Sequence, residues 1–177
     1  MVRITIGGPP GSGTSTVCRM IEERTGFEYI YAGQIFREKA VELGLTLAEF
    51  SELCEREPGY DMELDRLMLE HALKDDIILE GRMIGPLCKR DRIKAFKVYI
   101  DTDVGIRAAR VQERDGGEMG DVIRSMLDRE RSEIGRYLEY YHLDPREALH
   151  YDLVIDSGNM TPEMEVERIM DEMERGH

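Results

Sequence analysis

Short apolar runs alternate with longer amphipathic stretches along this chain. Five runs rich in β-branched residues predict strands, at residues 3–6, 28–31, 76–80, 97–101 and 152–156. Two of them, 76–80 and 97–101, are almost continuously apolar in their centres, as expected for strands buried on both faces. Helical patterns lie between the strands, at residues 14–25, 34–43, 47–56, 61–74, 104–114, 121–140 and 162–175. This alternation predicts an α/β fold with a five-stranded parallel sheet and helices on both faces.

Local signals set the ends of several elements. Gly26 stops the first helix, and Thr161 with Pro162 marks the start of the last one, as N-cap and first helical residue. The stretch 115–120 contains three glycines and is predicted to be the most flexible part of the chain. Repeats, low-complexity tracts and Pro/Ser-rich linkers are absent from the sequence, so residues 1–177 are expected to form a single domain.

Composition excludes several classes of function. The net charge of −13 argues against a nucleic-acid partner and against binding to an anionic membrane. Apolar runs fall well short of the ~20 residues of a membrane span, and the first residues do not resemble a secretory signal. The three cysteines Cys18, Cys54 and Cys88 are far apart and lack metal-ligand spacing. They are therefore expected to be reduced thiols in a cytoplasmic protein.

A glycine-rich loop follows the first strand. Gly8 and Gly13 have the spacing of the phosphate-binding loop G-x-x-x-x-G-K-[ST], in the required context of strand, loop and helix. Backbone amides of such a loop and the start of the helix can hold phosphate oxygens. Ser15 stands at the magnesium-binding hydroxyl position, with Thr16 as a second candidate. The candidate ATP-binding residues are Gly8, Pro9, Pro10, Gly11, Ser12, Gly13, Thr14, Ser15 and Thr16. A glycine-rich turn without a ligand is the alternative.

The lysine of this motif is replaced by Thr14, so another cation must approach the phosphates. The chain has 19 arginines and only five lysines, and arginine offers a planar fork for phosphate oxygens. Several arginines follow predicted strands or share one helical face: Arg37, Arg82, Arg107, Arg110, Arg129 and Arg136. Glu80 ends the third strand, where it could hold magnesium through water, cap a helix or pair with an arginine.

Four segments resemble the nucleoside monophosphate kinases, and specifically the archaeal-type cytidylate kinases. They are residues 4–17, 32–37, 79–82 and 152–157, and the threonine at position 14 is typical of that group. The resemblance implies a P-loop kinase fold with a small acceptor-binding insertion at about 34–75 and a lid region at about 107–136. It also implies that ATP and magnesium convert CMP or dCMP to the diphosphate. Its small-molecule partners would then be these nucleotides.

The resemblance assigns roles to residues as well. By this resemblance, the acceptor would be bound by Gly33, Arg37, Arg82, Glu133 and Arg136. The catalytic residues that contact the transferring phosphoryl group would be Arg82, Arg107, Arg110 and Arg129. Magnesium would be held by Ser15, Thr16 and, through water, Glu80. The serine that precedes the glycine in bacterial relatives is Ala32 here. The base-reading residue stays open among Glu57, Tyr60, Asp61, Asp65 and Arg66. Other readings are a kinase for UMP, AMP or a shikimate-like alcohol, and a nucleotide-binding regulator or slow ATPase, which the absent lysine favours.

Overall fold

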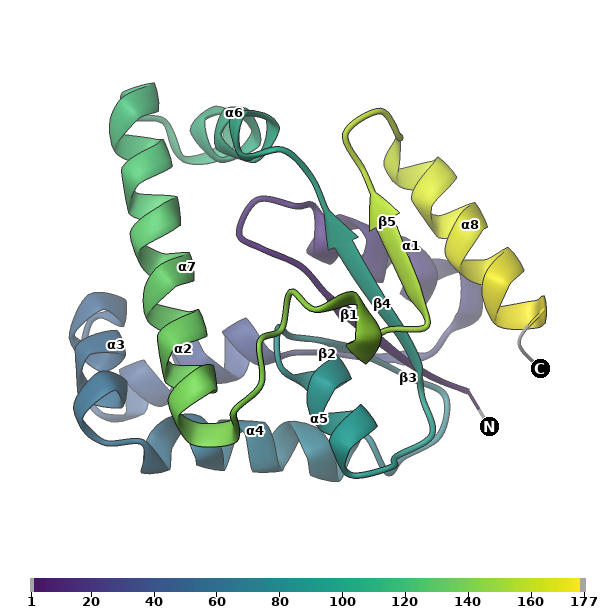
Figure 1. The fold of residues 1–177 in the computed structure, drawn as a ribbon, viewed down its shortest axis with the longest axis horizontal. Helices are drawn as coiled ribbons and strands as arrows, with labels where there is room; N and C mark the ends of the chain where they lie inside the picture. The colour runs from purple at the N-terminus through teal and green to yellow at the C-terminus, as the bar shows by residue number, and fades with distance from the viewer. Residues whose placement is uncertain (1, 176–177) are drawn as a thin grey trace.

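The computed structural model describes residues 2–175 and contains the five strands as one parallel sheet (Figure 1). The spatial order of the strands is β2-β3-β1-β4-β5. Their bounds are Arg3–Gly7 for β1, Glu28–Tyr31 for β2, Ile77–Glu80 for β3, Phe96–Asp101 for β4 and Leu153–Asp156 for β5. Because β1 lies between β3 and β4, the strand order reverses at β1. A ligand site is expected at the carboxyl end of this strand.

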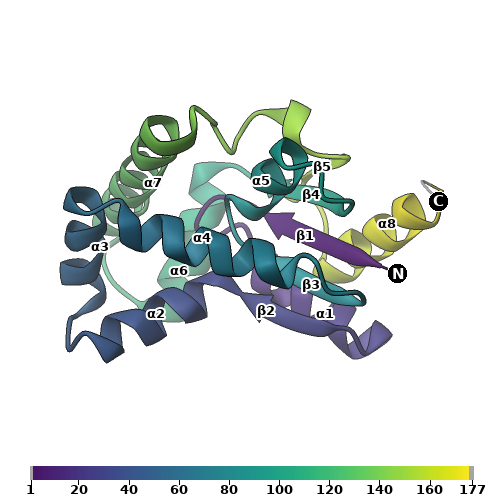
Figure 2. The same cartoon turned by 90° about the horizontal axis from the view of Figure 1, so that it is seen from below.

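Helices cover both faces of the sheet and extend beyond its carboxyl edge. Helices α1 and α8 pack on one face, and α4 and α5 on the other. Figure 2 shows α2 and α3 beside α4, with α7 next to α3, and α6 packs against α7. The helices are α1 Thr14–Thr25, α2 Ala32–Glu42, α3 Leu47–Arg56, α4 Gly59–His71, α5 Ile84–Arg90, α6 Val104–Asp115, α7 Met119–Tyr141 and α8 Pro162–Arg175, with a 3-10 turn at Ala148–His150.

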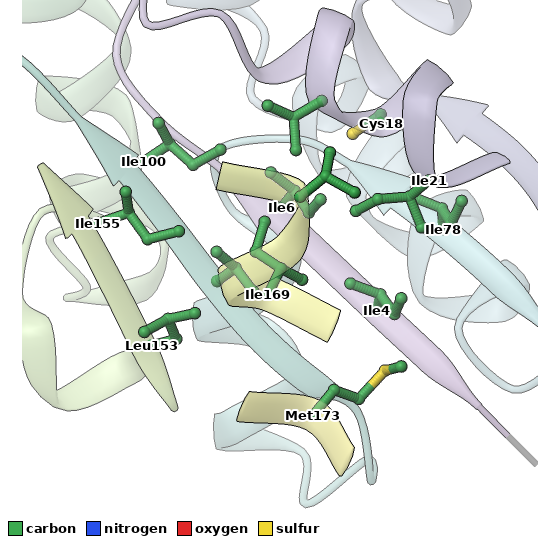
Figure 3. Close-up of a cluster of buried hydrophobic side chains, with 13 residues drawn as sticks. Ile4, Ile6, Cys18, Ile21, Ile78, Ile100, Leu153, Ile155, Ile169 and Met173 are labelled. Atoms are coloured by element: carbon green, nitrogen blue, oxygen red, sulfur yellow. The ribbon is translucent and has the colours of Figure 1, made fainter. Parts of the chain in front are cut away.

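The main core lies between the sheet and the pair α1 and α8 (Figure 3). Alternate residues of the strands point into it, which is why Ile78 packs here while its neighbours Ile77 and Leu79 pack against α4 and α5. Helix α8 contributes Ile169, which is fully buried among these strand residues. Burial of these side chains from both layers provides most of the apolar contact that holds the sheet together.

Two smaller apolar clusters lie outside the sheet. In the segment of α2, α3 and α4, the ring of Phe50 lies 4.6 Å from Phe36 and 5.7 Å from Tyr60, measured between centroids. Between α6 and α7, Val122 and Met126 pack against Ala108. Each segment therefore has its own local core in addition to its contacts with the rest of the molecule.

Several local predictions were incomplete. Helix α5 was missed, because a short helix that is buried almost throughout has no polar face and contains Gly85 and Pro86. Residues Ala32 and Gly33 were expected in a loop after the second strand, but β2 passes directly into α2. The loop expected at 115–120 is shorter, because α7 already begins at Met119.

Other local predictions are confirmed. The amide of Met164 donates to Thr161 Oγ1 at 3.3 Å, so Thr161 caps α8. The three cysteines are buried free thiols. Across residues 2–175, no helix combines the length and the apolar character that a membrane crossing requires.

The two faces of β5 allow a direct test of the main core. Ile155 is 1% exposed, whereas its neighbour Val154 is 43% exposed. Ile155→Ala should lower the free energy of unfolding by about 3 kcal/mol, because it leaves a cavity between the sheet and α8. Val154→Ala should lower it by less than about 1 kcal/mol. Urea denaturation of both variants measures the difference, and equal losses would contradict this description of the core.

Candidate active site

The loop between β1 and α1 requires glycine for close backbone contacts. A Cβ atom at position 8 would lie 2.4 Å from the carbonyl oxygen of Ile100, and one at Gly11 would lie 2.8 Å from that of Arg107. Gly13 has φ 92° and forms the N-cap of α1. As a glycine, it has no side chain with which to cap the helix. Its free amides and the positive end of the helix dipole therefore favour an anion at the switch point of the sheet.

Three hydroxyl groups surround the carboxylate of Glu80. Thr14 Oγ1 donates to it at 2.6 Å, Ser15 Oγ donates at 2.8 and 3.0 Å to its two oxygens, and the hydroxyl of Tyr29 also donates. Glu80 is only 4% exposed, at the end of β3. Burial and the bond to Glu80 raise the pKa of Tyr29 well above its usual value. The threonine that replaces the motif lysine is thus part of a network that fixes the first turn of α1.

This network favours Ser15 over Thr16 as the ligand of a divalent cation. Ser15 Oγ and the Glu80 carboxylate are hard oxygen donors, which magnesium prefers, whereas Thr16 is exposed. Among residues 2–175, no three His, Cys, Asp or Glu side chains lie together in a way that could hold a metal ion. The donors present fit a magnesium ion that keeps most of its ligands from water and phosphate.

Four of the predicted arginines lie beside the loop, each held by an acceptor on the protein. Arg82 pairs with Glu133, which also accepts a hydrogen bond from Arg129 Nε at 3.0 Å. Arg107 Nη1 donates to Glu130 Oε2 at 3.0 Å and to the carbonyl oxygen of Pro10 at 3.1 Å. Arg110 Nη1 donates to the carbonyl oxygen of Ser12 at 3.0 Å. These contacts join α6 and α7 to the phosphate-binding loop.

The electrostatics of this arginine group indicate a site for an anion. Burial and the like charge of Arg129 lower the pKa of Arg82 to about 10. Arg107 is 6% exposed, and its Nε has no hydrogen-bond partner within residues 2–175. A buried N–H without an acceptor is costly, and a phosphate oxygen would supply one. The arrangement can therefore bind a phosphate group between the loop and Arg82.

Other predicted acceptor residues lie in different surroundings. The Arg37 guanidinium lies 5.6 Å from the centroid of the Tyr31 ring. That ring also packs over Gly33, where a Cβ would lie 2.5 Å from it. Arg136 Nε donates to Asp61 Oδ2 at 2.6 Å in a buried ion pair between α7 and α4. Arg136 is thus held against α4, whereas Arg82 and Glu133 lie at the loop.

Two candidate base-reading residues contact α7. Asp61 accepts the hydrogen bond from Arg136, and Asp65 Oδ2 accepts one from the Tyr141 hydroxyl at 2.8 Å. Burial raises the pKa of Asp65 to about 7. Glu57 is exposed, as is Arg66. The sequence pattern gave no reason to pair these aspartates with α7, because the contacts cross more than 70 residues of chain.

Sequence reasoning missed several residues of this region. A pocket between the loop and α7 is lined by Gly8, Pro9, Arg82, Tyr99, Glu130, Glu133, Ile134, Pro145 and Arg146. Of these, Glu130, Tyr99, Ile134, Pro145 and Arg146 were not among the predicted site residues. Tyr29 was not foreseen as a partner of Glu80 either. Nor was Glu165, a carboxylic acid of α8 that is 3% exposed. The sequence offered one signal for this pocket wall: Glu130 lies one helical turn before Ile134 on the predicted helix, so the two share a helical face.

Comparison with known proteins agrees with the family that the sequence motifs resemble. The sequence model of a family described as an AAA domain matches residues 4–138. Three curated relatives are cytidylate kinases of archaea. The protein of Methanopyrus kandleri is 42% identical over 89% of this chain and 85% of its own length. That of Pyrococcus furiosus is 38% identical over 90% and 82%, and that of Methanococcus maripaludis 39% identical over 88% of each chain.

Solved structures with a similar fold are more distant in sequence. The shikimate kinase of Bacteroides thetaiotaomicron superposes with a TM-score of 0.66 at 14% identity, covering 98% of both chains. That of Acinetobacter baumannii, in complex with shikimate, superposes with a TM-score of 0.66 at 16% identity and covers 99% of this chain and 94% of its own. These similarities confirm the predicted fold class.

The buried Glu165 predicts a specific pH dependence of stability. Burial raises its pKa to about 7, although nearby Arg110 acts in the opposite direction. A carboxyl group whose pKa is raised on folding stabilises the protein while it is protonated, and this contribution is lost as the pH rises through about 7. Glu165→Gln should therefore stabilise the protein more at pH 8 than at pH 5, with a difference of about 2–3 kcal/mol in the free energy of unfolding.

Denaturant titrations at both pH values measure this difference. Glu163→Gln is the matched control, because Glu163 is exposed in the first turn of the same helix. A gain of equal size at pH 5 and pH 8 for Glu165→Gln would show that this carboxyl group does not titrate in that range.

Proposed function

Because this chain belongs to the cytidylate kinase family, we propose that it transfers the γ-phosphoryl group of ATP to CMP or dCMP with magnesium as the cation. Gly8 and Pro9 of the loop line one small pocket together with Arg82, and this adjacency is the observation that best supports neighbouring sites for the two nucleotides. It joins a loop suited to the donor phosphates to an arginine suited to the acceptor phosphate. A phosphoryl group can therefore pass between them over a short distance.

The reaction is a direct displacement. The bond between the γ-phosphorus and the bridging oxygen of ATP breaks, and its electron pair stays on ADP. A phosphate oxygen of CMP forms the new bond to phosphorus, which gives CDP. Such transfer depends on positioning and on neutralisation of charge, and it needs no covalent enzyme intermediate.

Each part of the site has a role in this proposal. The amides of residues 8–14 bind the donor phosphates. Magnesium would be held by Ser15 and, through water, by Glu80, and would neutralise phosphate charge. Arg37 and Arg82 bind the acceptor phosphate. Arg107, Arg110 and Arg129 act on the transferring group, and Arg82 and Arg129 exchange Glu133 for phosphate oxygens. Thr16, Gly33, Glu133 and Arg136 stay predicted binding residues.

The smaller apolar clusters support the predicted division of the single domain. Residues 34–75 would form the acceptor-binding insertion, and residues 107–136 the lid region. Both segments have local cores that can be kept intact while they move toward the bound nucleotides. Closure would exclude water, which otherwise could accept the phosphoryl group. A cytoplasmic location, with these nucleotides as partners, completes the proposal.

The proposal predicts strict dependence on the acceptor. ADP release from ATP and magnesium should require CMP or dCMP, because the phosphoryl group has no other oxygen to which it can pass in the closed site. A coupled assay with CMP, dCMP, UMP, AMP and GMP in turn measures this. A preference for UMP or AMP, or for shikimate in a separate assay, would reassign the acceptor. ADP release without any acceptor would instead indicate a slow ATPase.

Thr14 gives a second prediction. A lysine at this position would have its ammonium group beside the buried Glu80 carboxylate, where the two would form an ion pair. Thr14→Lys should therefore fail to raise kcat, whereas Arg107→Ala and Arg110→Ala should each lower it by about 10²-fold or more, because these arginines supply the missing charge.

Steady-state kinetics of the three variants, with thermal unfolding as the folding control, test this idea. A large increase in kcat for Thr14→Lys, with normal kcat for both arginine variants, would mean that the loop itself lacks a cation and that the arginines do not replace it.

A further inference from the structure

An arginine outside the predicted site lines the pocket between the two nucleotide positions. Arg146 lies in the connection between α7 and β5, which the sequence analysis left without a role. It contributes to the same pocket as Gly8 and Pro9 of the loop and as Arg82. We propose that Arg146 is a further catalytic residue, which binds the transferring phosphoryl group between donor and acceptor. This inference rests on the proposed function.

The backbone around Arg146 is fixed from both sides. The amide of Arg146 donates to Asp144 Oδ1 at 2.9 Å, which closes a turn. The carbonyl oxygen of Pro145 accepts a hydrogen bond from the Tyr151 hydroxyl at 2.5 Å. The Tyr151 ring in turn packs on Tyr99 of β4, with centroids 4.9 Å apart. The position of Arg146 relative to the sheet is therefore preorganised, as catalysis by charge requires.

The side chain of Arg146, in contrast, is free to exchange its partner. It is 53% exposed, and within residues 2–175 its guanidinium is held by Asp144, at 2.6 Å from Nη2 and 2.9 Å from Nε. An exposed ion pair of this kind contributes little free energy. A phosphoryl group offers the same forked pairing with a larger negative charge. Arg146 can therefore leave Asp144 for phosphate at small cost.

The charge of the pocket explains the need for another cation. Glu130 and Glu133 form part of its wall and would repel an incoming phosphoryl group. Three arginines, Arg107, Arg82 and Arg129, pair with these two carboxylates, so most of their charge is already engaged before a phosphoryl group arrives. The loop supplies no lysine, because position 14 is threonine. The pocket wall contains two arginines. Arg82 pairs with Glu133 of the same wall, whereas Arg146 pairs with Asp144, which is not part of the wall.

Substitution of Arg146 separates this role from a merely structural one. Arg146→Ala should lower kcat by about 10²-fold and leave KM for ATP and CMP within about threefold, because the contact with the phosphoryl group forms only in the transition state. Arg146→Lys should keep an intermediate rate, since it retains the charge and loses the fork. Arg175→Ala is the matched control: Arg175 is also exposed and paired with a nearby acid, Glu172, and should behave as the wild type.

A binding measurement gives a second readout. ADP, CMP, magnesium and aluminium fluoride together imitate the transferring phosphoryl group, and calorimetry measures their affinity. Arg146→Ala should weaken binding of this complex about as much as it lowers kcat. Asp144→Asn should strengthen it, and this gain should vanish when Arg146→Ala is also present.

The outcomes separate the inference from the proposed function. Failure of the wild type to form ADP with CMP or dCMP would overturn the proposed function and this inference with it. Normal CMP-dependent turnover, with Arg146→Ala equal to Arg175→Ala in kcat and in affinity for the fluoride complex, would overturn the inference alone. An equal gain from Asp144→Asn with and without Arg146 would also overturn it.

Discussion

The repulsion between like charges is the constraint that organises this molecule. A polyphosphate site needs several arginines in one place, but such a group cannot be packed together without anions between its members. Glu133 lies between Arg82 and Arg129, and Glu130 lies against Arg107. These two carboxylates belong to α7, so the helix holds the arginine group together before any nucleotide is bound. The acidic net charge of −13 is thus compatible with a locally basic site.

A second consequence concerns the loop without lysine. In this chain Thr14 binds Glu80 with its hydroxyl group, together with Ser15 and Tyr29. The loop is therefore built as a rigid frame of neutral donors around one buried carboxylate. Positive charge comes from side chains of other elements, and two of these, Arg107 and Arg110, already donate to carbonyl oxygens of the loop. The arginines of other elements thus compensate for the positive charge that the loop lacks at Thr14.

The sequence allowed most of the fold to be predicted, because strands buried on both faces and a glycine loop are strong local signals. Helix α5 escaped, since its burial removes the polar face that reveals a helix. Of the candidate site, the sequence predicted the glycine loop and Arg82 after β3, and the structure places them around one pocket. Glu130 and Arg146 were not predicted, because their importance comes from packing across the chain: Glu130 pairs with Arg107, and Arg146 lines the same pocket as Gly8. No local pattern records such contacts.

Helix α7 has one more consequence. Its first half packs in the α6–α7 cluster, and its second half is joined to α4 by the buried pair of Arg136 and Asp61 and by the bond from Tyr141 to Asp65. A continuous helix of 23 residues acts as a lever, so a rotation at one end moves the other. Under the proposed function, we therefore expect occupancy of the donor side to alter the affinity of the acceptor side. Thermodynamic reciprocity then requires that the acceptor alter the affinity for the donor by the same factor.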